Sequence, residues 1–401
     1  MNFVIKNFLL FYFLCISLNV EASSKSEILK QYVLKNGFIS HEKLFNNKDS
    51  NLSKTGKTFF NSTAISLNGN ISCSTCHLDS KGSADGLPVA AAIGGEGKGL
   101  ARFESGAQLL PRNTLPFWGR GGYGFNSFFW DGKVESKEGK ILSQFGSFPP
   151  SKDALVVAVH LPAVQIREML SDGNGVESLK KENLNAANTA FEIIAQKLKL
   201  YEEIASLKLA ETLNKRKENL SFNDYTRSLS AFIRDKFRIK ETKLEKFVNN
   251  KLALSKDELD GGILFYGKGR CSTCHSGPYF SDFDFHSVPF PQLGFGVNGF
   301  GVDYGRYNIT FNANDLYKFR TPPLHNVEKT GPYGHDGSVA NLDEAIIAHF
   351  DPLRLLDVNK MDAKKRHYFF QKLTSSDPSN VNYLTDNEVN KLVSFLKLLS
   401  F

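Results

Sequence analysis

Long apolar runs and blocks of basic residues are scarce in this chain of 401 residues. Beyond residue 22, no run approaches the about 20 apolar residues that a membrane-spanning helix needs. Lys and Arg number 49 against 42 Asp and Glu, and the net charge of +7 is spread along the chain. A polytopic membrane protein is therefore excluded, and no nucleic-acid partner is expected. With 41% hydrophobic and 23% charged residues, the composition is that of a globular protein and excludes wholesale disorder.

The amino terminus predicts a cleavable signal peptide over residues 1–22. Lys6 precedes an apolar run from Phe8 to Val20, and Val20-Glu21-Ala22 supplies a cleavage site. The run is too short to span a bilayer. A lipoprotein anchor at Cys15 is the alternative, although the large Leu14 stands where a small residue would be expected. We therefore expect an exported protein without a membrane span.

Cysteine is rare, and its placement is informative. Of five cysteines, Cys15 lies in the signal peptide, and the other four form Cys73-Ser74-Thr75-Cys76-His77 and Cys271-Ser272-Thr273-Cys274-His275. A two-residue gap followed at once by His is the attachment pattern of c-type haem. Two thiols on one helical turn can each add to a haem vinyl group, and the imidazole of the next residue then coordinates the iron. The sequence therefore predicts two covalent haem c groups.

Four cysteines in this arrangement have three alternative uses. An exported chain often forms two disulfides. A four-cysteine zinc site usually has its pairs about 15–20 residues apart, whereas here almost 200 residues separate them. A thioredoxin-like redox pair needs a βαβ context, which the sequence does not suggest.

The surroundings of the two motifs predict a mainly α fold with two cytochrome c-like haem domains, long irregular loops and few strands. We place one domain at residues 23–200 and the other at 201–401. Residues 277–312 are rich in Gly, Pro and Phe and predict an irregular loop. Thr385 predicts the start of a final helix, on which Val389, Leu392 and Leu396 form an apolar face.

Further segments carry a family resemblance. They are Arg112-Asn113-Thr114, Phe129-Trp130-Asp131-Gly132-Lys133, Phe319-Arg320-Thr321-Pro322-Pro323-Leu324 and Gly334-His335-Asp336-Gly337-Ser338, in this order around the two haem motifs. With these, the chain resembles the bacterial di-haem cytochrome c peroxidase and MauG family. The resemblance implies that hydrogen peroxide reacts at the N-terminal haem and that electrons pass through the C-terminal haem.

At the N-terminal haem, held by Cys73, Cys76 and His77, the chain departs from classical members. They carry a distal His after Ile-Gly, whereas here Gly95 follows Ile93-Gly94. The resemblance then implies an iron that is open to peroxide, as in the MauG branch. The alternative is that His41 or His160 supplies a sixth ligand.

At the C-terminal haem, held by Cys271, Cys274 and His275, the family places its sixth ligand eight positions along the helix that starts at Leu342. That residue is His349, where classical peroxidases have Met and MauG has Tyr. Two imidazole ligands would give a lower potential than His and Met. The alternative is a His on a helix face that does not reach the iron.

The resemblance also implies a catalytic carboxylate. The family's Glu-Met pair, with Pro six positions before the Glu, matches Pro162 and Glu168-Met169. Such a carboxylate would move a proton between the two peroxide oxygens. A distal Gln is missing, since Lys140 stands at its position, and Gln144 is a possible substitute. The alternative for Glu168 is a solvated Glu at a helix end.

Two further roles follow from the resemblance. Trp130 is expected between the haems as an electron relay, or as a core aromatic that packs under both. A calcium ion is expected between the domains, with the side chain of Asn113 and the backbone carbonyls of Thr330 and Pro332 as ligands.

The leading hypothesis is a periplasmic di-haem peroxidase or oxidoreductase. Its electrons would come from a small redox protein, a cytochrome c or cupredoxin, or from a specific protein substrate that it oxidises, as MauG does. The alternative is a non-catalytic di-haem cytochrome for electron transfer or redox sensing. The oligomeric state stays open, with a homodimer among the options.

Overall fold

The computed structural model describes residues 24–45, 50–171, 184–376 and 382–401. The predicted signal peptide lies outside these residues. No helix within them is long and apolar enough to cross a membrane.

Most regular structure in the described chain is helical. The elements of the first half are α2 (Ser50–Asn61), α3 (Cys73–Cys76), α4 (Leu100–Glu104), α5 (Ala154–His160), α6 (Leu184–Tyr201), α7 (Glu203–Thr212) and α8 (Phe222–Lys236). Those of the second half are α9 (Lys243–Val248), α10 (Lys256–Tyr266), α11 (Tyr307–Thr310), α12 (Leu342–Ala348), α13 (Ala363–Ser375) and α14 (Asp386–Lys397). A further helix covers residues 24–35. The prediction of a mainly α fold is confirmed.

Strands are few and short among the described residues. An antiparallel sheet has the order β1 (Ser127–Phe128), β2 (Val134–Lys137) and β3 (Lys140–Ser143). A second pair joins β4 (Phe285–His286) to β5 (Phe319–Arg320), with Phe285 opposite Arg320. Most of the predicted irregular loop at 277–312 is indeed without regular structure, apart from β4 and α11.

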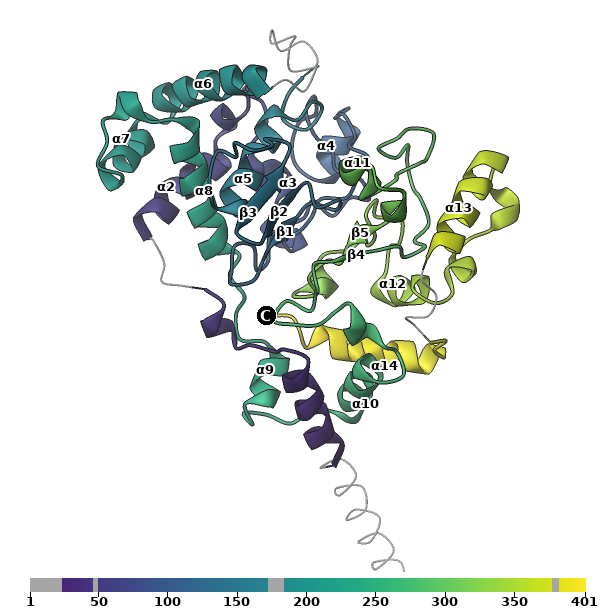
Figure 1. Ribbon diagram of the computed structural model, residues 1–401. Coiled ribbons are helices and arrows are strands. Elements are labelled where there is room, and N and C mark those ends of the chain that lie inside the picture. Colours follow the sequence, from purple (N-terminus) through teal and green to yellow (C-terminus); the bar gives the residue numbers. More distant parts are fainter. Residues whose placement is uncertain (1–23, 46–49, 172–183, 377–381) are drawn as a thin grey trace, which may run out of the picture.

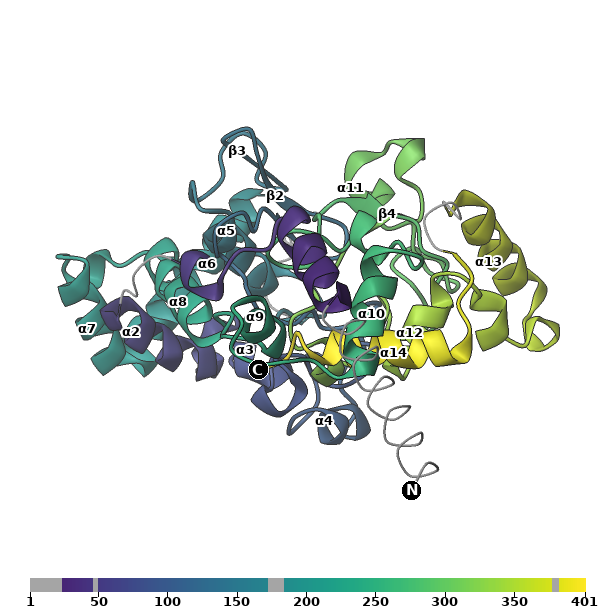
Figure 2. The same ribbon diagram turned by 90° about the horizontal axis from the view of Figure 1, so that it is seen from below.

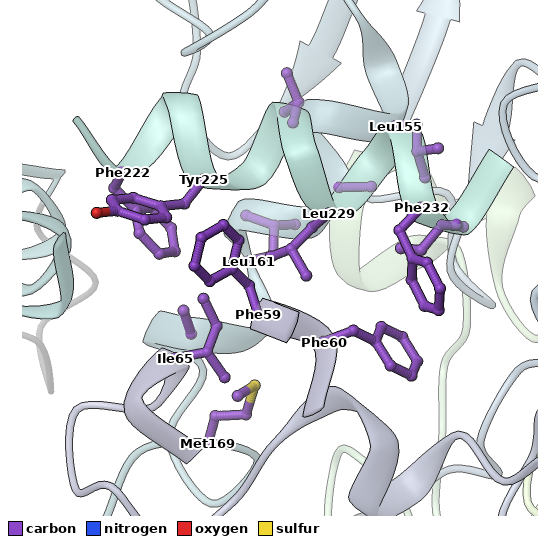
Figure 3. Packing of buried hydrophobic residues seen from close by; sticks show 14 of the residues in the cluster. Phe59, Phe60, Ile65, Leu155, Leu161, Met169, Phe222, Tyr225, Leu229 and Phe232 are labelled. Atoms are coloured by element: carbon purple, nitrogen blue, oxygen red, sulfur yellow. The ribbon is translucent and has the colours of Figure 1, made fainter. Parts of the chain in front are cut away.

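The first hydrophobic cluster is built on α2 and α8. Phe59 of α2 meets Tyr225 of α8 edge to face, with ring centroids 4.9 Å apart. The helices approach closely because Gly56 has no side chain: a Cβ there would lie 2.0 Å from the backbone oxygen of Ser228. Ile65 and Met169 lie below Phe59 in Figure 3 and belong to the same core. Cys73 and Cys76 pack against its edge.

The second cluster is built on α10 and α14. Thr385 caps α14 through the backbone N–H of Glu388, and Val389, Leu392 and Leu396 are buried, so the predicted final helix is confirmed. The 24–35 helix joins this cluster through Leu29 and Val33. Both views show that helix, in purple, beside α9 and α10 (Figures 1 and 2).

Near residue 240, the buried residues along the chain pass from the first hydrophobic cluster to the second. The main run of the first cluster extends through Ile239, beyond residue 200, with Tyr279 and Phe283 added from the second half, and the second begins its main run at Leu244. Figure 2 shows α7 of the first part and α13 of the second at opposite ends of the molecule. The domain boundary at residue 200 stays a prediction, and packing alone divides the chain about 40 residues later.

Candidate haem sites

The first motif forms the single helical turn α3. Ser72 and Thr75 cap this turn reciprocally, and the backbone N–H of His77 donates to the carbonyl of Cys73 over 3.1 Å. The turn therefore presents both thiols and the imidazole from one short segment. Neither motif contains a disulfide, because all four described cysteines are unbridged. The two-disulfide alternative is thus wrong for Cys73, Cys76 and the second pair.

The ring of His77 is oriented by its surroundings. Its Nδ1 lies 2.8 Å from the carbonyl oxygen of Ser83, and Phe117 stacks on it with centroids 3.7 Å apart. Donation from Nδ1 leaves the lone pair of Nε2 for a metal. Burial lowers the pKa of His77 to about 3, so the ring is neutral, the form that coordinates iron.

The second motif has the same design. The backbone N–H of His275 donates to the carbonyl of Cys271 over 2.9 Å, and its Nδ1 lies 2.8 Å from the carbonyl oxygen of Phe280. Burial lowers the pKa of His275 to about 4. Cys73 and Cys76 pack against the first hydrophobic cluster and Cys271 packs against the second, which speaks against a four-cysteine zinc site.

His349, the residue that follows α12, faces His275. The two ring centroids lie 6.5 Å apart with an interplanar angle of 62°. The Nδ1 of His349 lies 2.7 Å from the carbonyl oxygen of Ala345, which again leaves Nε2 for a metal. The spacing suits two imidazoles on opposite sides of one metal ion with metal–nitrogen bonds of about 2 Å. The donor set therefore fits a c-type haem with two His ligands.

Glu168 is half-buried on the first haem side. A tight turn presents it: Arg167 has a left-handed φ of 69° and its N–H donates to the carbonyl of Leu170 over 2.8 Å. Burial raises the pKa of the Glu168 carboxyl, and Lys133 opposes the shift. The carboxylate is also close enough to raise the pKa values of Cys73 and Cys76. Glu168 therefore lies near the first thiol pair.

The loop with Gly95 has no room for a side chain at that position. A Cβ on Gly95 would lie 2.5 Å from the backbone oxygen of Arg102 and 2.7 Å from the Cβ of Ala107. The two other candidate ligands are engaged elsewhere. His41 is bonded to the carboxylate of Glu245 on α9 over 2.9 Å, and the Nε2 of His160 lies 3.5 Å from the hydroxyl of Thr226 in a pocket of aromatic rings, Phe145, Phe191 and Phe222.

Trp130 lies where the two halves of the chain meet. Its indole Nε1 donates to the carbonyl of Asn113 over 3.0 Å, and its own carbonyl accepts from the backbone N–H of Arg320 over 2.8 Å. The neighbouring Asp131 is paired with Arg112 over 2.6 Å, and Arg112 also binds Asp303 in the second half. This buried triad holds the Trp130 segment against both halves.

Two of the three predicted calcium ligands lie in contact. The side-chain amide of Asn113 donates to the carbonyl of Pro332 over 2.7 Å. Rotating this amide by half a turn would place two oxygens side by side, as a hard cation requires. Thr330 is two residues from Pro332, and its hydroxyl donates to the carbonyl of Val327 over 3.1 Å. Calcium at this position stays a prediction.

Sequence reasoning did not single out Lys133, which belongs to the Trp130 segment. Its ammonium lies 5.0 Å from the centroid of the Phe129 ring and acts electrostatically on Glu168. Gln144, the suggested distal Gln, is exposed beyond β3. A second unforeseen cluster joins Cys274, Asp282 and His286, but Cys274 is required by the haem motif.

Comparisons with known proteins place the chain among related sequences and structures. Residues 50–253 match the family described as di-haem cytochrome c peroxidase. The cytochrome-c peroxidase IdrP1 of Denitromonas iodatirespirans is 25% identical over 80% of this chain and 81% of its own length. The methylamine utilization protein MauG of Methylorubrum extorquens is 25% identical over 74% of this chain and 67% of its own. The solved diheme peroxidase BthA of Burkholderia thailandensis has a TM-score of 0.62 at 18% identity and covers 91% of this chain and 89% of its own.

The family match spans half of the chain and includes the first haem motif, while both relatives align over most of its length. The second motif repeats the design of the first, with the same orienting bond from Nδ1 of the motif's His to a backbone carbonyl. The chain therefore belongs to the di-haem cytochrome c peroxidase family and is a haem-dependent peroxidase or oxidoreductase with two haem c groups.

Proposed function

We propose that this protein reduces hydrogen peroxide at the first haem site with electrons delivered through the second. One peroxide molecule takes up two electrons and two protons and gives two molecules of water. The observation that carries the proposal is the position of Glu168, whose half-buried carboxyl lies near Cys73 and Cys76 and has a raised pKa.

The cysteines and histidines divide into two binding sets. Cys73, Cys76 and His77 would hold the first haem, and Cys271, Cys274, His275 and His349 would hold the second. When bound, the haem irons supply the redox chemistry that breaks the O–O bond and transfers electrons. His349 supports an electron-transfer role for the second site, because a second imidazole leaves no coordination position for peroxide there.

Glu168 would move the proton that this cleavage needs. In its ionised form a carboxylate Oε accepts a proton from one peroxide oxygen and then donates it to the other, which leaves as water. Lys133 favours the ionised form, while burial favours the protonated form. These opposing effects suit a group that must both accept and donate.

The open access to the first site rests on Gly95. Its contacts with the Arg102 carbonyl and Ala107 exclude a side chain, His41 is bonded to Glu245, and the Nε2 of His160 faces the hydroxyl of Thr226. We therefore infer that peroxide reaches this site in the resting protein without a ligand having to leave first.

Trp130 would carry electrons between the two sites, because its segment is bonded to both halves of the chain. The electron source is a small redox protein, a cytochrome c or cupredoxin, or a protein substrate that is itself oxidised. The relatives named cytochrome-c peroxidase favour the first source. We further propose export to the periplasm by the 1–22 signal peptide and a calcium ion at Asn113, Thr330 and Pro332.

Low-temperature electron paramagnetic resonance of the ferric holoprotein tests the proposal. We expect one high-spin signal from the first site and one low-spin signal from the second, both reduced by one equivalent of peroxide. Two low-spin signals that do not respond to peroxide would contradict the open site and favour a non-catalytic electron carrier.

A further inference from the structure

Two buried arginines have no acidic partner in the described part of the chain. Arg120 is 6% exposed and Arg320 is 1% exposed. The nearest acid to act on Arg320 is Asp131, which is already paired with Arg112 over 2.6 Å. Buried charges in proteins are ordinarily paired, so these two guanidinium groups call for an anion.

Their hydrogen bonds are few for groups with five N–H donors each. Nε of Arg120 donates to the carbonyl of Pro116 over 3.2 Å. Arg320 donates from Nε to the carbonyl of Phe129 over 2.9 Å and from Nη1 to that of Thr321 over 3.3 Å. Neutral carbonyls do not neutralise the charge, and several donors remain for a further ligand.

The two arginines also act on each other. Burial lowers the pKa of Arg120 to about 9, and the positive charge of Arg320 contributes to this shift. Burial likewise lowers the pKa of Arg320 to about 10. Two like charges placed together out of water repel each other, and an anion between them would turn that repulsion into attraction.

Their position connects the two haem sites. The guanidinium of Arg120 lies 4.9 Å from the ring centroid of Phe117, the residue that stacks on His77. The guanidinium of Arg320 lies 5.7 Å from the ring centroid of Phe283. Phe283 directly follows Asp282, whose backbone N–H donates to the carbonyl of Cys274 over 2.8 Å. Arg120 is therefore separated from His77 by one ring, and Arg320 packs on the segment that is bonded to Cys274.

We propose that Arg120 and Arg320 bind carboxylates, namely the propionate groups of the attached haems. Guanidinium groups match carboxylates with paired, charge-assisted hydrogen bonds. A free inorganic anion would offer similar chemistry, but the near-complete burial of both arginines favours carboxylates that are already anchored inside the protein. The assignment requires that two haems are attached. It does not depend on whether peroxide reacts at either of them.

The test uses the holoprotein and four variants. Arg120→Gln and Arg320→Gln remove one charge each. Arg120→Lys keeps the charge but loses the planar guanidinium with its paired N–H donors. Arg234→Gln is the matched control, because Arg234 donates to the carbonyl of Gly121, next to Arg120, yet has its own acid in Asp153. Resonance Raman spectra report the propionate bending bands, and redox titration reports the potentials.

We expect the propionate bands to shift in both Gln variants and in Arg120→Lys. Loss of a positive charge beside a haem should move the Fe(III)/Fe(II) equilibrium about tenfold toward Fe(III), a fall of about 59 mV in potential for one electron. Arg120→Lys should keep the wild-type potential, and Arg234→Gln should change neither readout.

Unchanged bands and potentials in both Gln variants would overturn the proposal. A wild-type potential that depends on whether chloride, sulfate or acetate is present at constant ionic strength would assign the pair to a free anion and would also overturn it. If the Gln variants do not assemble, wild-type propionate bands that stay in place after exchange into deuterium oxide would contradict hydrogen bonding from the guanidinium groups.

Discussion

His275 and His349 face each other with their ring centroids 6.5 Å apart, and each ring has its Nδ1 bonded to a backbone carbonyl oxygen. The residues are more than 70 positions apart in the sequence. Since both rings keep Nε2 for a metal, the chain itself would supply both axial ligands that we propose for the second haem.

Replacing His349 should affect the second haem alone. His349→Met should raise its reduction potential, because a thioether ligand favours the ferrous state more than imidazole does. His349→Ala should convert its low-spin signal to high-spin. Redox titration and electron paramagnetic resonance check both results, with His367→Ala on exposed α13 as the control. An unchanged low-spin signal in His349→Ala would show that His349 is not the ligand.

Glu168→Gln should slow the reaction with peroxide by about 100-fold or more, since it removes the group that moves the proton. The resting absorption spectrum should not change. Stopped-flow mixing with peroxide measures the rate, and Glu104→Gln at the exposed end of α4 is the control. A wild-type rate in Glu168→Gln would contradict the assignment.

The rate of the peroxide reaction should also depend on pH through the Glu168 carboxyl. The ionised form must accept the first proton, and burial raises the pKa of Glu168 above its ordinary value. The wild-type rate should therefore fall on acidification. The midpoint of this fall should lie at a higher pH than the pKa of about 4.3 of an exposed Glu. A stopped-flow pH profile measures this acidic limb. The limb should disappear in Glu168→Gln, and its persistence there would assign it to another group.

Trp130→Phe should slow electron transfer between the haems. The change removes the indole and its bond to the carbonyl of Asn113, while a ring of similar position remains. Rapid mixing of half-reduced protein with peroxide can follow each haem separately. Trp118→Phe is the matched control. Equal transfer rates in wild type and Trp130→Phe would favour a packing role only.

Arg112→Ala should destabilise the protein strongly. Asp131 and Asp303 are both buried, and each would lose its cationic partner. Breaking a buried ion pair by removing one partner costs about 3–5 kcal/mol. Denaturant unfolding measures the loss, and Arg354→Ala, at an exposed pair with Asp386, should cost far less. Similar losses in both variants would contradict a special role for this triad.

Calcium removal should lower the melting temperature if Asn113, Thr330 and Pro332 hold the ion. Treatment with the chelator EGTA, followed by addition of calcium, should lower and then restore the thermal midpoint. In Asn113→Ala the midpoint should no longer respond to either treatment. A wild-type midpoint that is insensitive to EGTA would argue against the site.

The haem-attachment segments could be predicted from the sequence because their chemistry is local. Two cysteines and a histidine within five residues need only one turn of helix to act together, and α3 provides that turn. The final helix could be predicted in the same way, since the capping Thr385 and the apolar residues of the helix lie close together in the sequence. The mainly α class followed from the same short-range patterns.

Residues that act across the chain needed the tertiary structure. His349 was found only through a family register, and its approach to His275 depends on how α12 packs against the second cluster. Nothing in the sequence indicates that Arg120 and Arg320 are buried near each other, and folding alone brings them together without an acid. The sequence by itself determined which groups can hold haem, because covalent attachment is a local matter. Only the fold decided which charges surround the haems, because burial and pairing depend on segments that are distant in the chain.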